Sequence, residues 1–152
     1  MASKLAAAKI AAWSGVRVVI AAADTAGVVL DAIEGRSVGT AVHARSTRLT
    51  SRKLWIAFAR GAAGRIVVDA GARRALCEDN RSLLPAGVKA VEGAFEPDAA
   101  VEVVDEDGRP FAKGVVRYSA TALRKAAGQR TADLPEGLPH EVIHKDDLVV
   151  LP

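Results

Sequence analysis

Basic side chains are the groups in this sequence whose type and position could do chemistry. Lys4 falls in the first turn of a predicted helix, where free N–H groups and the positive end of the helix dipole favour a bound anion. Without an anion, the same lysine is a solvated surface residue.

The remaining candidate groups do not assemble into a catalytic or metal site. His140 and His144 have the spacing of metal ligands on a helix, but they flank a predicted strand and have no third ligand nearby. Cys77 has no histidine positioned to activate it, so we expect it in the core. The acidic turn at 105–109 lacks the later glutamate of a calcium loop. We expect no complete catalytic site and no metal.

Composition places the chain among ordinary globular proteins. It has 152 residues, of which 50% are hydrophobic and 26% charged. One cysteine excludes an internal disulfide, which favours a reducing compartment. The longest apolar run, 18–23, is far shorter than the about 20 residues of a membrane helix, and Lys9 and Arg17 interrupt any signal peptide. We expect a cytoplasmic protein with no membrane partner.

Charge is distributed unevenly along the chain. Residues 1–61 carry a net charge of +6, whereas residues 62–152 carry −3. Phosphate neutralisation supplies most non-specific affinity for nucleic acids. The acidic balance of the second part therefore counts against RNA binding there.

The first sixty residues have the pattern of the end of an α/β domain. Helices are predicted at 3–14, with Ser3 as N-cap, and at 28–34. The run 16–22 is typical of a strand buried on both faces of a parallel sheet, and 39–42 of a further strand. A basic linker at 44–53 and an apolar strand at 54–59 follow, before the glycine-rich break at 61–64.

The second part predicts a small barrel or curled sheet. A strand at 65–69 and a helix at 70–79 precede a β core over 82–119, with Asn80 as a left-handed cap. Within this core, 101–104 is a strand and 105–109 a turn in which Gly108 takes a positive φ. A helix at 119–127 with Ser119 as N-cap leads to short strands at 141–143 and 148–151.

Three stretches resemble the C-terminal part of bacterial glutamate 5-kinases. The sequence Ser-Leu-Leu-Pro-x-Gly-Val at 82–88, followed by Glu-Gly-x-Phe at 92–95, is similar to the PUA domain that ends those enzymes. Met1, Ser3 and Lys4 match the end of their phosphate-binding segment Gly-Thr-Gly-Gly-Met-x-[Ser/Thr]-Lys. Residues 26–40 also resemble the kinase tail, with alanine at 26 where the family usually has proline.

The resemblance implies an α+β chain with two domains. Residues 1–60 would be a C-terminal remnant of an α/β amino-acid-kinase domain with a basic linker. Residues 62–152 would be a mainly β, PUA-like pseudo-barrel. It implies that Met1, Ser3 and Lys4 contact nucleotide phosphates, and that ATP and Mg²⁺ belong to the full kinase only. Such a fragment would phosphorylate L-glutamate, the first step of proline biosynthesis, only with the missing N-terminal kinase segment or within a homo-oligomer.

Two other functions remain open beside an inactive kinase fragment. A stand-alone PUA module would bind structured RNA in the groove beside its first helix. The residues there that the resemblance selects are Arg73, Arg74, Asn80, Arg81, Ser82 and the run to Gly87. Its three arginines could contact phosphates, and Tyr118 could offer a stacking face to a base. A charged helix face beside a structural turn is the alternative interpretation. Asparagine stands at position 80 where the family usually has glycine. The third alternative is a regulatory or oligomerisation module without a ligand.

Overall fold

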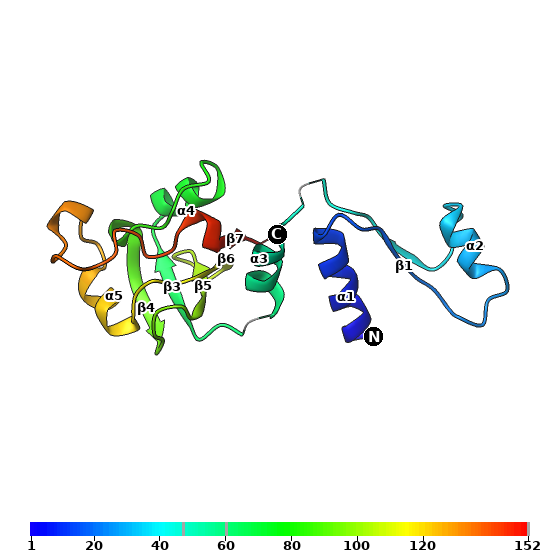
Figure 1. Cartoon of the computed structure of the whole chain (residues 1–152), viewed down its shortest axis with the longest axis horizontal. Helices are drawn as coiled ribbons and strands as arrows, with labels where there is room; N and C mark the ends of the chain where they lie inside the picture. The colour runs from blue at the N-terminus through cyan, green and yellow to red at the C-terminus, as the bar shows by residue number, and fades with distance from the viewer. Residues whose placement is uncertain (47, 60, 152) are drawn as a thin grey trace. The chain divides into compact units, whose positions relative to one another are not determined.

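A computed structural model describes residues 1–46, 48–59 and 61–151 of the chain (Figure 1). The chain divides into two compact units, Met1–Leu54 and Trp55–Pro152. Among the described residues, no helix combines the length and apolar character that crossing a bilayer requires.

The first unit pairs two short strands with helices. Its elements are α1 (Ala2–Trp13), β1 (Val18–Ile20), α2 (Val28–Ile33), β2 (Thr40–Val42) and α3 (Ser51–Leu54). β1 and β2 are antiparallel, with Val19 opposite Ala41, and form a two-stranded sheet. Gly39 is required before β2 because its φ is +59° and a Cβ there would lie 2.2 Å from the carbonyl oxygen of Ile20.

Two details of this unit differ from the expectations. The prediction that β1 is buried on both faces is wrong, because its three residues are only half-buried. Its neighbour among the described residues is β2 rather than a parallel strand. The predicted N-cap at Ser3 is also wrong, since α1 begins at Ala2 with Met1 as a cap that makes no side-chain hydrogen bond.

The basic segment after β2 covers the carboxyl end of α1. The backbone N–H of Arg45 donates to the carbonyl of Ala12 (3.0 Å), and Arg48 Nε donates to the carbonyl of Ser14 (2.9 Å). The Arg45 guanidinium lies 4.0 Å from the centroid of the Trp13 ring. The Arg48 guanidinium therefore satisfies the carbonyl of Ser14, and both cations lie near the negative end of the helix dipole.

Residues 54–59 are helical, which corrects the predicted strand. The short α3 runs into a π-helical turn, η1 (Trp55–Ala59). Thr50 Oγ1 accepts from the N–H of Lys53 and caps the start of α3. Ile56 is fully buried whereas Trp55 is 46% exposed. An apolar run of six residues has no period that separates a strand from a buried helix, and here it continues the helix that Thr50 caps.

The second unit is built on a five-stranded mixed sheet. The strands are β3 (Gly64–Val68), β4 (Val88–Gly93), β5 (Ala100–Val104), β6 (Pro110–Val115) and β7 (Leu148–Val150). Their order is β4-β3-β5-β6-β7, in which β3 and β5 are parallel and all other neighbours antiparallel. Helices α4 (Ala70–Cys77) and α5 (Ala120–Ala126) and the 3₁₀ turns η2 (Pro85–Gly87), η3 (Thr131–Asp133) and η4 (Lys145–Asp147) complete the unit.

Local signals in this unit match the expectations in most places. Ser119 is the N-cap of α5 and accepts from the N–H of Ala122 (3.2 Å). Asn80 and Gly108 have φ of 49° and 76°, so the left-handed cap and the glycine turn are confirmed. The predicted strand at 141–143 is wrong, because this segment forms a single bridge, between Ile143 and Leu83.

The core of the second unit lies between the sheet, the helices and the 141–143 segment. Its members include Ile66, Val68, Leu83, Val101, Val103, Val116, Tyr118, Leu123 and Ile143. The Tyr118 hydroxyl donates to the carbonyl of Pro139, which satisfies the one polar atom of a ring that is 1% exposed. Gly114 permits the close approach of Ile143, whose Cγ2 would lie 2.6 Å from a Cβ at that position.

Candidate functional site

A groove of about 350 Å³ lies between α4 and the loop that leads to β4. Its lining includes Asp69, Ala72, Ala75, Arg81, Ser82 and Gly87. Asp69 Oδ1 accepts from the N–H of Ala72 (2.7 Å) and thereby caps α4. Gly87 passes so close to α4 that a Cβ there would lie 2.5 Å from Ala72 Cβ. The two walls are thus in contact at the Gly87 end.

Backbone contacts fix the outer wall of the groove. After the left-handed Asn80, the N–H of Arg81 donates to the carbonyl of Ala75 (3.1 Å). Ser82 Oγ accepts from the N–H of Lys145 (3.0 Å). Leu83 then pairs with Ile143. Because each residue of the wall is held by a different element, the groove is preformed rather than assembled around a ligand.

The structure divides the residues proposed for RNA contact into two sets. Arg81, Ser82 and Gly87 line the groove, whereas Arg73 and Arg74 line a second hollow of about 370 Å³ with Cys77. Asn80 is exposed and lines neither. Successive residues of a helix are about 100° apart, so positions 73, 74 and 77 face away from positions 72 and 75. The helical period therefore predicts which residues of α4 face the groove, whereas a selection by charge alone does not.

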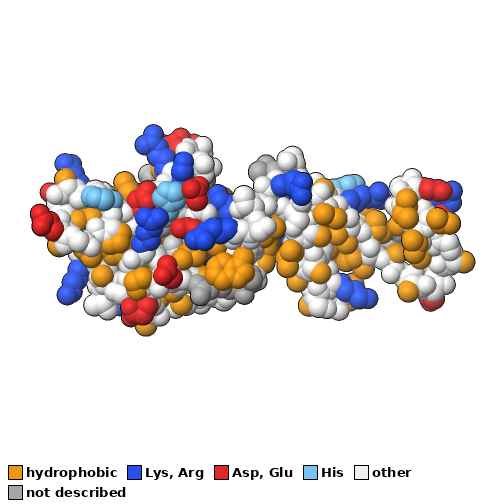
Figure 2. All heavy atoms as spheres, viewed as in Figure 1, with side chains coloured by type: hydrophobic (Ala, Val, Ile, Leu, Met, Phe, Trp, Pro, Cys, Tyr) orange, Lys and Arg blue, Asp and Glu red, His pale blue; other side chains and the backbone are white. Residues whose placement is uncertain are grey.

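Carboxylates lie close to one arginine of the groove and to one of the second hollow. Arg73 Nε lies 3.8 Å from Asp105 Oδ2, and Arg81 Nε lies 3.9 Å from Asp79 Oδ2. Over the second unit, Figure 2 shows positive and negative side chains interspersed on the face in view rather than gathered by sign. The Arg81–Asp79 pair is exposed and therefore weak, so a phosphate could displace that carboxylate. The surface is not a strongly basic stripe.

Two side chains differ from their predicted surroundings. Cys77 is exposed rather than in the core, because it lies on the outer face of the two-turn helix α4. Partial burial still raises the pKa of its thiol above the ordinary value, although Arg73 acts in the opposite direction. Tyr118 is 1% exposed, so its ring offers no stacking face to a base.

The first turn of α1 places Met1, Ser3 and Lys4 at an exposed helix start. No side chain caps this end, and the first turn contains no acidic residue. Uncapped N–H groups beside a lysine suit one phosphate group. Among the described residues there is no group of three or more His, Cys, Asp or Glu side chains that could hold a metal. The start of α1 therefore offers groups for one phosphate, and these residues do not by themselves fit Mg²⁺–ATP.

His144, near the C-terminus, makes local structural contacts. His144 Nδ1 accepts from the N–H of Asp146 (3.2 Å) and so caps η4. Its Nε2 lies 4.0 Å from Glu141 Oε2, which in turn lies 3.4 Å from Arg117. This small polar cluster holds η4 beside the Leu83–Ile143 bridge.

The second unit is similar to PUA domains. Residues 64–138 match the PUA domain family, and they contain β3 to β6, α4, α5 and the groove. A PUA domain from Aeropyrum pernix K1, known from a crystal structure, is 26% identical, with a TM-score of 0.43 over 61% of this chain and 48% of that one.

The whole chain is similar to glutamate 5-kinases. The enzyme from Moorella thermoacetica is 41% identical over 99% of this chain and 41% of its own length. That from Rhodococcus jostii is 44% identical over 99% of this chain and 40% of its own. The chain thus spans about two fifths of these relatives. The predicted resemblance to the C-terminal part of bacterial glutamate 5-kinases is confirmed.

Proposed function

We propose that this chain is the C-terminal part of a glutamate 5-kinase, carries its PUA domain and is inactive alone. In the complete enzyme it takes part in the ATP-dependent phosphorylation of L-glutamate, the first step of proline biosynthesis, in the cytoplasm. The observation that carries the proposal is the 41–44% identity to glutamate 5-kinases over 99% of the chain.

The chemistry of the reaction agrees with an active site whose residues come from both parts of the kinase. A carboxylate kinase must align two substrates and stabilise the transferred phosphoryl group, usually with Mg²⁺. Met1, Ser3 and Lys4 would contribute a contact to the nucleotide phosphates from the start of α1. The glutamate site, the metal ligands and most of the nucleotide site would come from the N-terminal part of the kinase.

The test adds that part as a separate polypeptide. Hydroxylamine trapping would measure glutamyl phosphate made from ATP, Mg²⁺ and glutamate by this chain, by the N-terminal part of the Moorella thermoacetica enzyme, and by their mixture. We expect product only from the mixture. No product from the mixture, while the intact Moorella enzyme is active in the same buffer, would overturn the proposal.

A matched pair of lysines tests the phosphate contact. Lys4→Ala should lower the activity of the mixture by about a hundredfold, the usual loss when one donor to developing charge is removed. Lys9→Ala changes an exposed lysine later in α1 and should have little effect. Equal activities of the two variants would show that neither Lys4 nor the start of α1 belongs to the nucleotide site.

RNA binding by the PUA domain is a second candidate, favoured by the preformed groove that Arg81 and Ser82 line. Affinity for a structured RNA, measured over a range of salt, should fall with a shallow slope because few cations are involved. Arg81→Ala should reduce the magnitude of that slope by about 0.7 to 0.9, whereas Arg109→Ala, in the acidic turn, should not. No saturable binding at low salt would exclude this function. A regulatory or oligomerisation role without a ligand is the remaining alternative, and it would show as self-association.

A further inference from the structure

Strand β4 forms one edge of the five-stranded sheet. It is the outermost strand in the order β4-β3-β5-β6-β7 and, among the described residues, it pairs only with β3. The opposite edge is the three-residue β7, whereas β4 has six residues, of which Lys89, Ala90, Glu92 and Gly93 are exposed. A long exposed edge is a template for pairing with another chain. The β4 edge therefore offers another chain more to pair with than the β7 edge does.

Helix α5 lies along β4 (Figure 1) and is hydrogen-bonded to the segments at both ends of this strand. At the start of the helix, the N–H of Ala120 donates to the carbonyl of Phe95 (2.8 Å), two residues beyond the end of β4. Past the other end of the helix, the N–H of Gly128 donates to the carbonyl of Pro85 (2.9 Å), three residues before β4 begins. Helix and strand thus run in opposite directions over the length of β4.

Arg124 is the residue of α5 whose side chain reaches the edge of β4. Its Nε donates to the carbonyl of Val91 (3.4 Å), and its Nη2 donates to the carbonyl of Gly93 (2.5 Å). Alternate residues of a strand direct their carbonyls to the same edge, and the carbonyl of Phe95, bonded to Ala120, continues this series. Three successive carbonyls on the outer side of β4 are therefore bonded to α5.

The chemistry of arginine suits this position. A guanidinium is planar, carries five N–H donors and can hold two acceptors at once, whereas a lysine ammonium is a point charge. Among the described residues, the guanidinium of Arg124 makes its hydrogen bonds to the two β4 carbonyls and forms no ion pair. Its charge also disfavours self-pairing, because two copies that approached each other by β4 would bring two such cations together.

We propose that Arg124 blocks pairing of the β4 edge with the β4 strand of a second copy of the chain. While the guanidinium holds the carbonyls of Val91 and Gly93, an incoming strand cannot donate its own N–H groups to them. Pairing must first displace two hydrogen bonds in each copy. This inference is independent of the proposed function, because it concerns the second unit alone.

The β4 sequence is otherwise suited to pairing with itself. In an antiparallel pair the outward residues of the two strands face each other, and a register centred on Val91 meets this condition. That register places Lys89 opposite Gly93 and Ala90 opposite Glu92, so no like charges are directly opposed. A second copy is also present at the same concentration as the chain itself. Without Arg124, we therefore expect β4 to pair with another β4.

The test compares self-association of the full chain and of its Arg124→Ala variant. Sedimentation velocity over a range of concentrations gives the dimer dissociation constant, and hydrogen exchange measured by NMR follows the amide of Val91. We expect Arg124→Ala to tighten dimerisation by about tenfold or more, because two bonds in each copy no longer have to be broken. The Val91 amide should exchange more slowly as the concentration rises, because it would donate to Val91 of the second copy.

Two further variants are the controls. Lys125→Ala removes the adjacent exposed cation, which lines a different hollow with Pro135 and Leu138, so it should sediment like the wild type. Arg124→Lys keeps the charge and an aliphatic stem but loses the planar arrangement of donors. It should associate to an intermediate extent, and it keeps the comparison valid if Arg124→Ala folds poorly.

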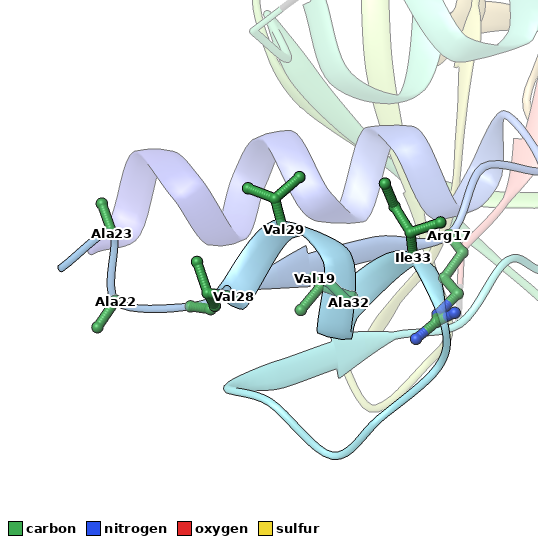
Figure 3. A pocket seen from close by; sticks show the side chains of 9 residues that line it. Arg17, Val19, Ala22, Ala23, Val28, Val29, Ala32 and Ile33 are labelled. Carbon is green, nitrogen blue, oxygen red and sulfur yellow. The ribbon is translucent and has the colours of Figure 1, made fainter. Parts of the chain in front are cut away.

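An apolar surface of the first unit must be distinguished from the β4 edge. Val29 and Ile33 of α2 are 68% and 73% exposed beside a hollow of about 540 Å³ that Val19 and Arg17 also line (Figure 3). Copies of a chain can associate through such a surface as well. Wild-type association is therefore measured first, and only an increase that is accompanied by protection of the Val91 amide is assigned to β4.

Each outcome supports or overturns the role of Arg124. Stronger association of Arg124→Ala than of Lys125→Ala, with slower exchange at Val91, supports it. Equal association of these two variants overturns it, and so does association without protection of Val91, which would place the contact elsewhere. Faster exchange throughout β3 and β5 in both Arg124 variants would mean that Arg124 stabilises the fold of the second unit rather than blocks its edge, and would also overturn the proposal.

Discussion

Replacing Gly87 by alanine would place a methyl group where the two walls of the groove already touch. Its Cβ would lie 2.5 Å from Ala72 Cβ, whereas carbon atoms in favourable contact are about 3.5 to 4.0 Å apart. Relief requires the loop or α4 to move by about 1 Å. Overpacking of this kind costs about 1 to 3 kcal/mol, so we expect a loss near 2 kcal/mol in the free energy of unfolding of the second unit.

A second substitution isolates the cause. Ala72→Gly alone should cost about 1 kcal/mol because glycine is a poorer helix former. Combined with Gly87→Ala it removes the clashing methyl group, so the double variant should lose about 1 kcal/mol rather than the sum of the two single losses. Gly61→Ala is the control, since no atom lies within 4 Å of a Cβ there, and it should change stability by less than about 0.5 kcal/mol.

The assay must report on the second unit alone, because the chain has two units. Hydrogen exchange of the slowest amides of β3 and β5 measures the global opening of that unit. Additive losses in the double variant, within about 0.5 kcal/mol, would refute the assignment of the cost to contact between Gly87 and Ala72.

Three further predictions concern individual contacts. Asp69→Ala removes the N-cap of α4 and should cost about 1 kcal/mol in urea unfolding, whereas an unchanged midpoint would contradict the capping role. Burial raises the pKa of the Tyr118 phenol, so its contribution to stability is complete below about pH 10 and is lost as the pH rises through the raised pKa. Tyr118→Phe should therefore cost about 1 kcal/mol at pH 7 through the lost bond to Pro139, but should show a shallower decline than wild type above about pH 10. Arg45→Ala should lower the stability of the first unit by about 0.5 to 1 kcal/mol through the lost contact with Trp13, and hydrogen exchange at the end of α1 should show it.

Local signals in the sequence were sufficient where one side chain determines the backbone. Ser119 caps a helix, and Gly108 takes a positive φ, because each effect depends on a few neighbouring atoms. The apolar run 54–59 lacked such a signal of its own, and its helical form follows from the cap at Thr50. The parallel pairing of β3 with β5 is a long-range choice that no short pattern specifies.

Only some of the residues that line the groove could be predicted from the sequence. The resemblance to PUA domains selected Arg81 and Ser82, and both line the groove. It also selected Arg73, yet on the α4 side the groove is lined by the small residues Ala72 and Ala75. Charge identifies groups that can bind a ligand, whereas the helical period determines which of them face the same space.

The strand order of the second unit also determines when its sheet can be completed during synthesis. β3 pairs with β4, which follows it after α4, and with β5, so these pairings can form as soon as their segments leave the ribosome. β6 gains its second neighbour only from Leu148–Val150, after α5 and the turns η3 and η4 have been made. At about 5 to 20 residues per second, one edge of β6 stays open for seconds on the nascent chain. The last strand therefore closes a largely folded sheet, and the interval before it does so is the time when this unit is most exposed to wrong pairing with another chain.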